Sequence, residues 1–263
     1  MEKKKLIIVC TSVVVAVAAL GVGVYVGLET QKEAEEAETL LEEEQEQEVQ
    51  IVVEDLTYDF STTDDVKDLD AIRQEYGNED IYAWLTIPGT TVDFPVLQSE
   101  EDNYYLDHCV DGTEGYPGSI YTNAIEGKDF TRANTIIYGH NMKNGSYFGQ
   151  LHLFEDEEFF NENKEIYIYL ENRKLTYEII IASQFSNEYL PDIYSFSMAL
   201  DAENFLDDVV AYAPDDETTN IADDVSLGDW EQIITLSTCV AGEGEKRYMV
   251  IGKLVEVEMY PEN

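Results

Sequence analysis

The chain of 263 residues carries 15 Lys and Arg against 56 Asp and Glu, which gives a formal net charge of −41 at pH 7. A surface this acidic repels phosphate groups, so nucleic acids are excluded as partners, whereas a cationic amine is compatible with it. The length suits one domain of ordinary size once the two ends are set aside.

The N-terminal segment predicts a membrane anchor. Leu6–Leu28 contains no charged side chain, and a helix of 23 residues spans roughly 34 Å, enough to cross a hydrocarbon core of about 30 Å. Lys3, Lys4 and Lys5 precede it, so residues 1–5 are expected in the cytoplasm and the remainder outside. A cleaved signal peptide is the alternative, but its apolar region is usually shorter, about 7–15 residues.

An acidic stalk is predicted over residues 29–56. Glu29–Gln50 contains ten Glu and one Lys, and it has too little apolar surface to offset the entropy of ordering. It is therefore expected to be either a solvated helix or a disordered linker. Residues 57–263 are expected to form the folded domain.

Patterning within residues 57–263 predicts a mainly β fold. A short helix is expected at Asp64–Tyr76, helical segments at Ser146–Asn161, and a helix at Asp201–Ala213 with Asp201 as its N-cap. Eight runs rich in β-branched and aromatic residues predict strands: Ile81–Ile87, Val92–Leu97, Ser119–Thr122, Thr135–His140, Glu165–Glu171, Leu175–Phe185, Gln232–Thr238 and Arg247–Val257. Many short strands with few helices predict a closed or nearly closed β-barrel.

The few cysteines argue against a disulfide framework. Cys10, Cys109 and Cys239 are an odd set without regular spacing, which leaves both a Cys109–Cys239 bridge and free thiols open. Cys239 follows an apolar, β-branched run, so it is expected at the end of a strand. The loop Val240–Lys246 would then return Arg247 toward it, where a positive charge favours thiolate and stabilises an oxyanion. The alternative is an inert, buried thiol.

His140 is the imidazole expected to serve that thiol, because it also ends a predicted strand. His108 adjoins Cys109, but neighbouring residues on a strand point to opposite faces. His152 lies in a helical segment, where a packing role is the simpler explanation. The sequence contains no CxxC, HxxxH or HExxH pattern, so no metal and no other cofactor is expected.

Four segments, in order along the chain, resemble motifs of class B sortases. They are Ile87-Pro88-Gly89-Thr90 with Val92-Asp93-Phe94-Pro95-Val96, Asn103-Tyr104-Tyr105-Leu106, Tyr138-Gly139-His140-Asn141-Met142 with Gly145-Ser146-Tyr147-Phe148-Gly149, and Thr235-Leu236-Ser237-Thr238-Cys239. The last matches the TLxTC signature of sortases, and Arg247 stands where that family has its arginine. The resemblance extends from about residue 66 to 257 and implies an eight-stranded sortase-type β-barrel over residues 57–263.

The resemblance also implies the roles of individual residues. Cys239 would be the nucleophile, His140 its acid/base partner and Arg247 the oxyanion stabiliser. The residues expected to contact the substrate are Ser237, Thr238, Asn141 and Tyr189, with strand packing or an ordinary surface position as the alternative for each. Only seven residues separate Cys239 from Arg247, and the acidic side chains of Glu243 and Glu245 between them could compete for the arginine.

A class B sortase is expected to cleave a C-terminal sorting signal, NPxTx- or SPxTx-like, on secreted proteins through a thioester. It would then transfer them to a stem or cross-bridge amine of peptidoglycan, from an extracellular domain held at the membrane by the N-terminal helix. The alternatives are a pilin-polymerising sortase, a cysteine protease that hydrolyses the thioester, and a catalytically silent, membrane-tethered binding module.

Overall fold

The computed structural model describes residues 57–59, 66–214, 216–228 and 231–260, which belong to one compact unit, Leu56–Asn263. The predicted membrane span at 6–28 and the stalk at 29–56 lie outside the described residues. Within the described part, no helix has the length and apolar character needed to cross a bilayer.

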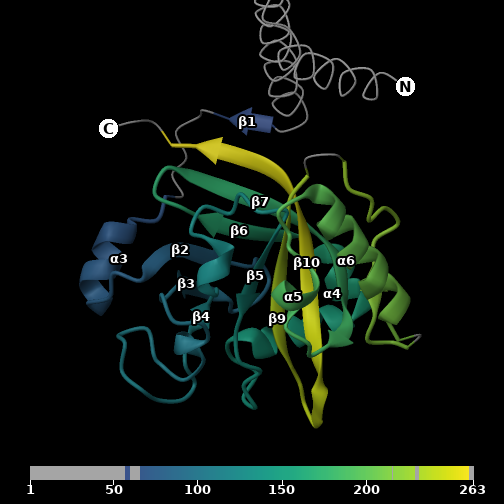
Figure 1. Cartoon of the computed structure of the whole chain (residues 1–263), viewed down its shortest axis with the longest axis horizontal. Coiled ribbons are helices and arrows are strands. Elements are labelled where there is room, and N and C mark those ends of the chain that lie inside the picture. Colours follow the sequence, from purple (N-terminus) through teal and green to yellow (C-terminus); the bar gives the residue numbers. More distant parts are fainter. Residues whose placement is uncertain (1–56, 60–65, 215, 229–230, 261–263) are drawn as a thin grey trace, which may run out of the picture. The chain divides into compact units, whose positions relative to one another are not determined.

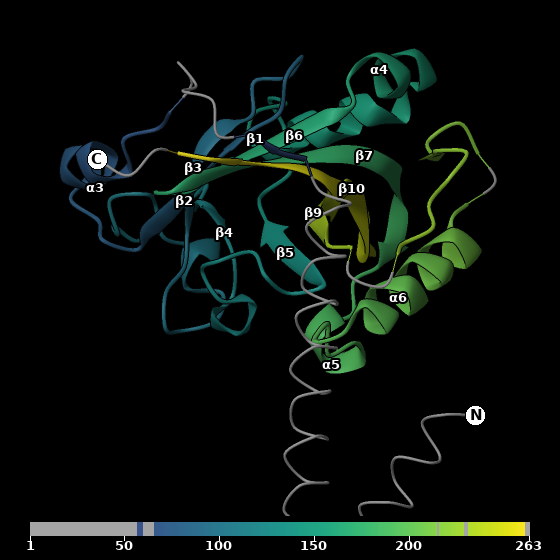
Figure 2. The ribbon, with the colours of Figure 1, turned by 90° about the horizontal axis from the view of Figure 1, so that it is seen from above.

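Eight strands close into a barrel (Figures 1 and 2). They are β2 (Ile81–Thr86), β3 (Asp93–Leu97), β4 (Ile120–Tyr121), β5 (Asn134–Tyr138), β6 (Glu165–Tyr169), β7 (Arg173–Ser186), β9 (Ile233–Val240) and β10 (Glu243–Met259). Their order is β10-β9-β5-β4-β3-β2-β6-β7, and pairing of β10 with β7 closes the ring. The expected mainly β, eight-stranded barrel is thus confirmed, and each predicted run overlaps one of these strands.

Two further short strands extend the sheet without joining the ring. β1 (Thr57–Asp59) pairs in parallel with β10, and β8 (Asn220–Ile221) pairs with β7. Neither was predicted, because segments of three and two residues are too short to show an alternating pattern.

β10 pairs with several strands because it is long and its register is irregular. It pairs with β7 and β9, and its register shifts at Ile251/Gly252 and at Leu254/Glu256. Such bulges bend a strand and increase its twist, which closure of a barrel requires. Gly252 lies at the first shift, where a Cβ would come within 3.0 Å of the Tyr177 Cβ.

Helices occupy the connections between strands. They are α3 (Leu69–Tyr76), the 3₁₀ segments η1 (Tyr104–Leu106), η2 (Ala124–Glu126) and η3 (Phe148–Glu155), then α4 (Glu157–Glu162), α5 (Leu190–Ile193) and α6 (Ala199–Tyr212). α3 begins later than predicted, because Asp68 caps it by accepting from the Ala71 amide at 2.9 Å. The predicted N-cap of α6 is wrong: Met198 occupies that position, and Asp201 instead accepts a hydrogen bond from the Ser195 hydroxyl.

The barrel has apolar side chains on both faces. One cluster fills the interior, and a second lies between the outside of the sheet and the helices α5 and α6, where Phe196 and Phe205 are fully buried. Figure 2 shows α6 along the outer side of β7. β7 is therefore buried at every position from Leu175 to Phe185 except Glu178, rather than at alternate ones.

Glu126, at the end of η2, is a buried carboxylate next to this framework. Its side chain is 1% exposed, and its Oε2 atom lies 3.7 Å from the Nε atom of Arg132. Burial raises the pKa of Glu126 to about 7, although the Arg132 guanidinium lowers it. The native state therefore favours the protonated acid over a pH range in which the unfolded chain has already lost that proton.

The stability of the fold is expected to fall as pH rises from about 4.5 to 7, because the native state binds more protons at Glu126 than the unfolded state does in that window. Glu126→Gln should flatten this dependence, which would amount to about 3 kcal/mol between the two ends. Urea unfolding at several pH values measures it. The matched control is Glu75→Gln at an exposed site on α3, and an unchanged slope in Glu126→Gln would contradict the prediction.

Candidate active site

Cys239 lies near the end of β9, directly opposite Arg247 on β10. The expected loop Val240–Lys246 is wrong, because β9 continues to Val240 and β10 already begins at Glu243. Gly242, with a φ of 81°, allows so tight a turn. Directly opposed residues of an antiparallel pair present their side chains on the same face. The register of β10 is irregular between Glu243 and Arg247, after which Arg247 pairs with Cys239, so the hairpin places the thiol and the guanidinium on the same face.

The guanidinium of Arg247 is not taken up by the neighbouring acids. Glu243 pairs with Lys246 at 2.6 Å, and among the described residues no carboxylate lies within ion-pair distance of Arg247. Its Nη1 atom donates a long hydrogen bond, 3.3 Å, to the Lys246 carbonyl. The positive charge thus remains available to a group that binds beside Cys239.

His140 follows the end of β5 and is oriented by a main-chain carbonyl. Its Nε2 atom lies 2.7 Å from the Leu106 oxygen. A carbonyl only accepts, so Nε2 carries a proton and Nδ1 is the nitrogen that can exchange one. The ring of Tyr116 packs against the imidazole with the centroids 5.3 Å apart.

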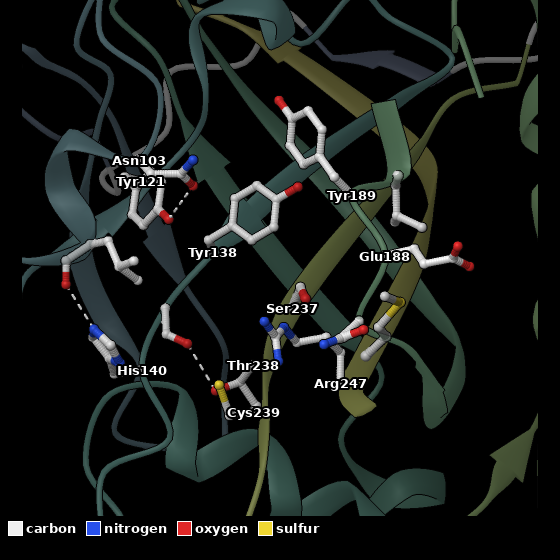
Figure 3. Close-up of a pocket in the computed structure, with 15 residues that line it drawn as sticks. Asn103, Tyr121, Tyr138, His140, Glu188, Tyr189, Ser237, Thr238, Cys239 and Arg247 are labelled. Carbon is white, nitrogen blue, oxygen red and sulfur yellow. Dashed lines mark hydrogen bonds between the residues drawn. The ribbon is translucent and has the colours of Figure 1, made fainter. Parts of the chain in front are cut away.

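One cavity of about 170 Å³ collects these groups. Six of the predicted site residues line it, namely Cys239, His140, Arg247, Ser237, Thr238 and Tyr189. Figure 3 shows Cys239 between His140 on one side and Arg247 on the other. Cys239 is exposed, so its thiol is accessible from solvent.

Ser237 and Thr238 are buried at the floor of the cavity. The Thr238 hydroxyl donates to the Gly139 carbonyl at 2.8 Å, which ties β9 to the end of β5. The hydroxyl of Thr238 therefore already has a partner within the protein.

Asn141 is the predicted site residue that does not line the cavity. Its Nδ2 atom instead lies 2.8 Å from the main-chain oxygen of Cys239. Among the other histidines, His108 contacts Asp107 and stacks on Tyr104. His152 stacks on Tyr248, as expected of a packing residue, but its Nε2 atom also lies 3.2 Å from the Cys239 oxygen.

Aromatic side chains form the wall of the cavity opposite Arg247. Tyr121 and Tyr138 stack with centroids 5.5 Å apart, and the Asn123 side chain donates to the Tyr189 hydroxyl at 3.2 Å. Burial raises the pKa of all three phenols, so they remain neutral. Asn103 accepts from the Tyr121 hydroxyl at 3.1 Å.

Sequence reasoning assigned no site role to Asn103, Tyr121, Tyr138 or Glu188, which also line the cavity. Asn103 and Tyr138 lie within the segments that resemble sortase motifs, so a signal for them was present. Glu188 lies next to the predicted Tyr189, in the segment before the last two strands that the resemblance places along the signal groove. Tyr121 carried no such signal, because only the closure of the barrel brings it here.

A thiol, an imidazole and a guanidinium around one accessible cavity can perform nucleophilic acyl transfer. The bridge between Cys109 and Cys239 is excluded, because both are free thiols. In the part of the chain that the structure describes, no three His, Cys, Asp or Glu side chains converge as metal ligands would.

Comparison with known proteins agrees with this chemistry. Residues 85–255 match the model of the sortase domain. Sortase B of Listeria monocytogenes is 34% identical over 198 residues, which cover 73% of this chain and 74% of the relative. The crystal structure of Clostridium perfringens sortase B superposes with a TM-score of 0.61 at 28% identity, covering 71% of this chain and 100% of that one. For the Staphylococcus aureus sortase B–substrate complex the TM-score is 0.60 at 25% identity, covering 71% and 84%.

The barrel and its cysteine site thus define a cysteine transpeptidase. The chain belongs to the sortase family, and its relatives and structural neighbours place it in class B.

Loss of the Thr238 hydroxyl is expected to destabilise the fold. Thr238→Val keeps the shape but leaves the Gly139 carbonyl without its donor, which should lower the free energy of unfolding by about 1–3 kcal/mol. Urea denaturation measures the change. Thr113→Val, at a surface hydroxyl that bonds only to Asp111, is the matched control, and an equal loss in both variants would argue against this account.

Proposed function

We propose that this transpeptidase cleaves a C-terminal sorting signal, NPxTx- or SPxTx-like, on secreted proteins and transfers them to an amine of peptidoglycan. The observation that carries the proposal is the direct pairing of Cys239 with Arg247 in a cavity that His140 also lines. It is supported by solved structures of sortase B relatives bound to substrate and to triglycine, a peptide with a free amine.

In the first half-reaction the proton of the Cys239 thiol passes to Nδ1 of His140, and the resulting thiolate attacks the carbonyl carbon of the scissile peptide bond. The electron pair moves onto the carbonyl oxygen, where the unpaired guanidinium of Arg247 stabilises it. When the tetrahedral intermediate collapses, the C–N bond breaks, and His140 donates the proton at Nδ1 to the departing nitrogen. The acyl group remains on sulfur as a thioester.

The second half-reaction reverses these steps with a new amine. The incoming nitrogen attacks the thioester carbonyl and gives up a proton to His140, and the C–S bond breaks to regenerate the thiolate. One amide is exchanged for another, so no external energy source is needed. The acidic surface is compatible with a cationic acceptor that approaches this exposed thiol.

Pilin polymerisation is the second candidate. A class B sortase of Streptococcus pyogenes that is described as involved in pilus biogenesis has the same fold, with a TM-score of 0.59 at 26% identity. The two functions differ in the acceptor, a lysine of a pilin subunit or an amine of peptidoglycan. A competition between the two amine types for one thioester distinguishes them.

Cleavage of quenched peptides of the LPxTG, NPxTx and SPxTx types, with and without an added amine, tests the proposed reaction. Cys239→Ala should abolish cleavage, and Arg247→Gln should lower kcat by about 10²–10³, as for loss of an oxyanion donor. An added amine should yield an amide adduct at the expense of hydrolysis. Cleavage that survives Cys239→Ala would refute the mechanism, and cleavage without any adduct would indicate a protease.

We further propose that residues 6–28 anchor the chain in the cell membrane with residues 29–263 outside. Support comes from the uncharged run after Lys3–Lys5 in the sequence. The full chain is expected to remain in the membrane fraction after alkaline carbonate washing and to be degraded by protease added to protoplasts. A chain that begins at residue 29 should be released, and a full chain extracted by carbonate would contradict the proposal.

A further inference from the structure

β9 extends beyond the strand that runs beside it. In the parallel pair, Tyr138 at the end of β5 lies opposite Ser237, and the Gly139 amide still donates to the Ser237 oxygen at 3.2 Å. Alternate carbonyls along a strand point to the same neighbour, so the Cys239 oxygen points to the side that β5 has left. The side-chain amide of Asn141 occupies that place and donates to the Cys239 oxygen at 2.8 Å.

Asn141 is in turn held by a second histidine. Its Nδ2 atom lies 2.9 Å from His152 Nε2, and His152 Nδ1 lies 2.6 Å from the Oε1 atom of Glu155. A carboxylate only accepts, so Nδ1 carries a proton, and an amide nitrogen only donates, so Nε2 is the acceptor of the contact with Asn141. The two hydrogens of the Asn141 amide then serve two acceptors, His152 Nε2 and the Cys239 oxygen.

The imidazole of His152 is itself fixed from two sides. Glu155 ends η3, and the ring stacks on Tyr248 with centroids 4.8 Å apart and an interplanar angle of 28°. Tyr248 is fully buried on β10, opposite Thr238 of β9. Neither Asn141 nor His152 nor Glu155 lines the cavity, so this network lies behind the nucleophile rather than in front of it.

We propose that His152 and Glu155 are positioning residues: they orient the Asn141 amide, and through it they fix the peptide group of Cys239. The proposal rests on Cys239 being the nucleophile. β5 pairs with β9 only as far as Ser237, so without Asn141 the main chain of Cys239 would be held on the β10 side alone. A displacement of about 1 Å at the reacting atom can cost on the order of 100-fold in rate. The network takes no proton from the thiol, which leaves proton transfer to His140.

A double-mutant cycle in the full chain, purified in detergent, tests this coupling. His152→Ala and Asn141→Ala should each lower kcat for cleavage of an NPxTx peptide by about tenfold, with KM little changed. The double variant should also lose only about tenfold: Nε2 as an acceptor makes no hydrogen bond to the Cys239 oxygen 3.2 Å away, so His152 acts through Asn141. His152→Gln keeps an acceptor near the Nε2 position and should recover most of the rate. Alkylation of Cys239 by iodoacetamide needs an exposed thiolate but no aligned peptide carbonyl, so its rate should stay within about twofold.

Independent losses that multiply to about 100-fold would overturn the proposal, as would a His152→Ala variant as inactive as Cys239→Ala. Glu155→Gln is compared with Glu158→Gln, an exposed glutamate on α4, and equal activities would exclude a role for Glu155. The urea unfolding midpoints of all variants distinguish loss of stability from displacement of Cys239 in a folded chain.

A spectroscopic measurement tests the positioning role without a peptide substrate. In chain labelled at histidine and cysteine, nitrogen NMR should show His152 protonated at Nδ1 and unprotonated at Nε2, and the Cys239 carbonyl resonance should shift in His152→Ala. If wild type cleaves no peptide, the proposed signal fails while this result still decides the positioning role. The opposite tautomer, or an unmoved carbonyl resonance, would refute it.

Discussion

The site depends on the unequal lengths of three neighbouring strands. β9 lies between β5 and β10, and it has partners on both sides up to Ser237 but only on the β10 side at Cys239. One neighbour, β10, therefore supplies Arg247, which pairs directly with Cys239 after an irregularity in the strand. The departure of the other opens the space into which His140 and the substrate cavity fit. A longer β5 would satisfy the Cys239 carbonyl through its main chain and would close the cavity.

The charges around the site leave the guanidinium of Arg247 without a carboxylate partner among the described residues. The chain has 15 cationic side chains against 56 acidic ones, and Lys246, the cation next to the site, is paired with Glu243. Arg247 is held by strand pairing rather than by an acid. A positive charge that is positioned without being neutralised can stabilise a developing oxyanion at little cost in reorganisation.

Much of the fold was predictable because local patterns and the barrel agree. All eight barrel strands are long enough, or flanked by clear enough turns, to be found from composition, and the catalytic candidates fall at two strand ends.

Prediction failed where contacts between distant segments decide the local structure. The turn at Gly242 shortened an expected loop, the start of α6 at Ala199 displaced the cap from Asp201, and β1 and β8 exist only because a longer strand offers them an edge. The position of His152 beside the nucleophile's main chain could not be predicted, because it requires η3 to fold back against β10. The resemblance pointed to all six cavity residues, but their common cavity is a property of the closed barrel.

The closure of the barrel by β10 has a consequence for folding of the chain during synthesis. A polypeptide is synthesised from its N-terminus, and domains form as their last segments emerge. β10 supplies Arg247, pairs with β9 and completes the barrel through β7, yet it follows the other seven barrel strands in the sequence. Neighbouring strands of a hairpin meet quickly, whereas His140 must be met across about a hundred residues of sequence. A nascent or truncated chain that ends before β10 therefore has a thiol but neither an enclosed barrel nor its arginine. Closure of the barrel and completion of the Cys239–Arg247 pair therefore depend on the same strand, β10.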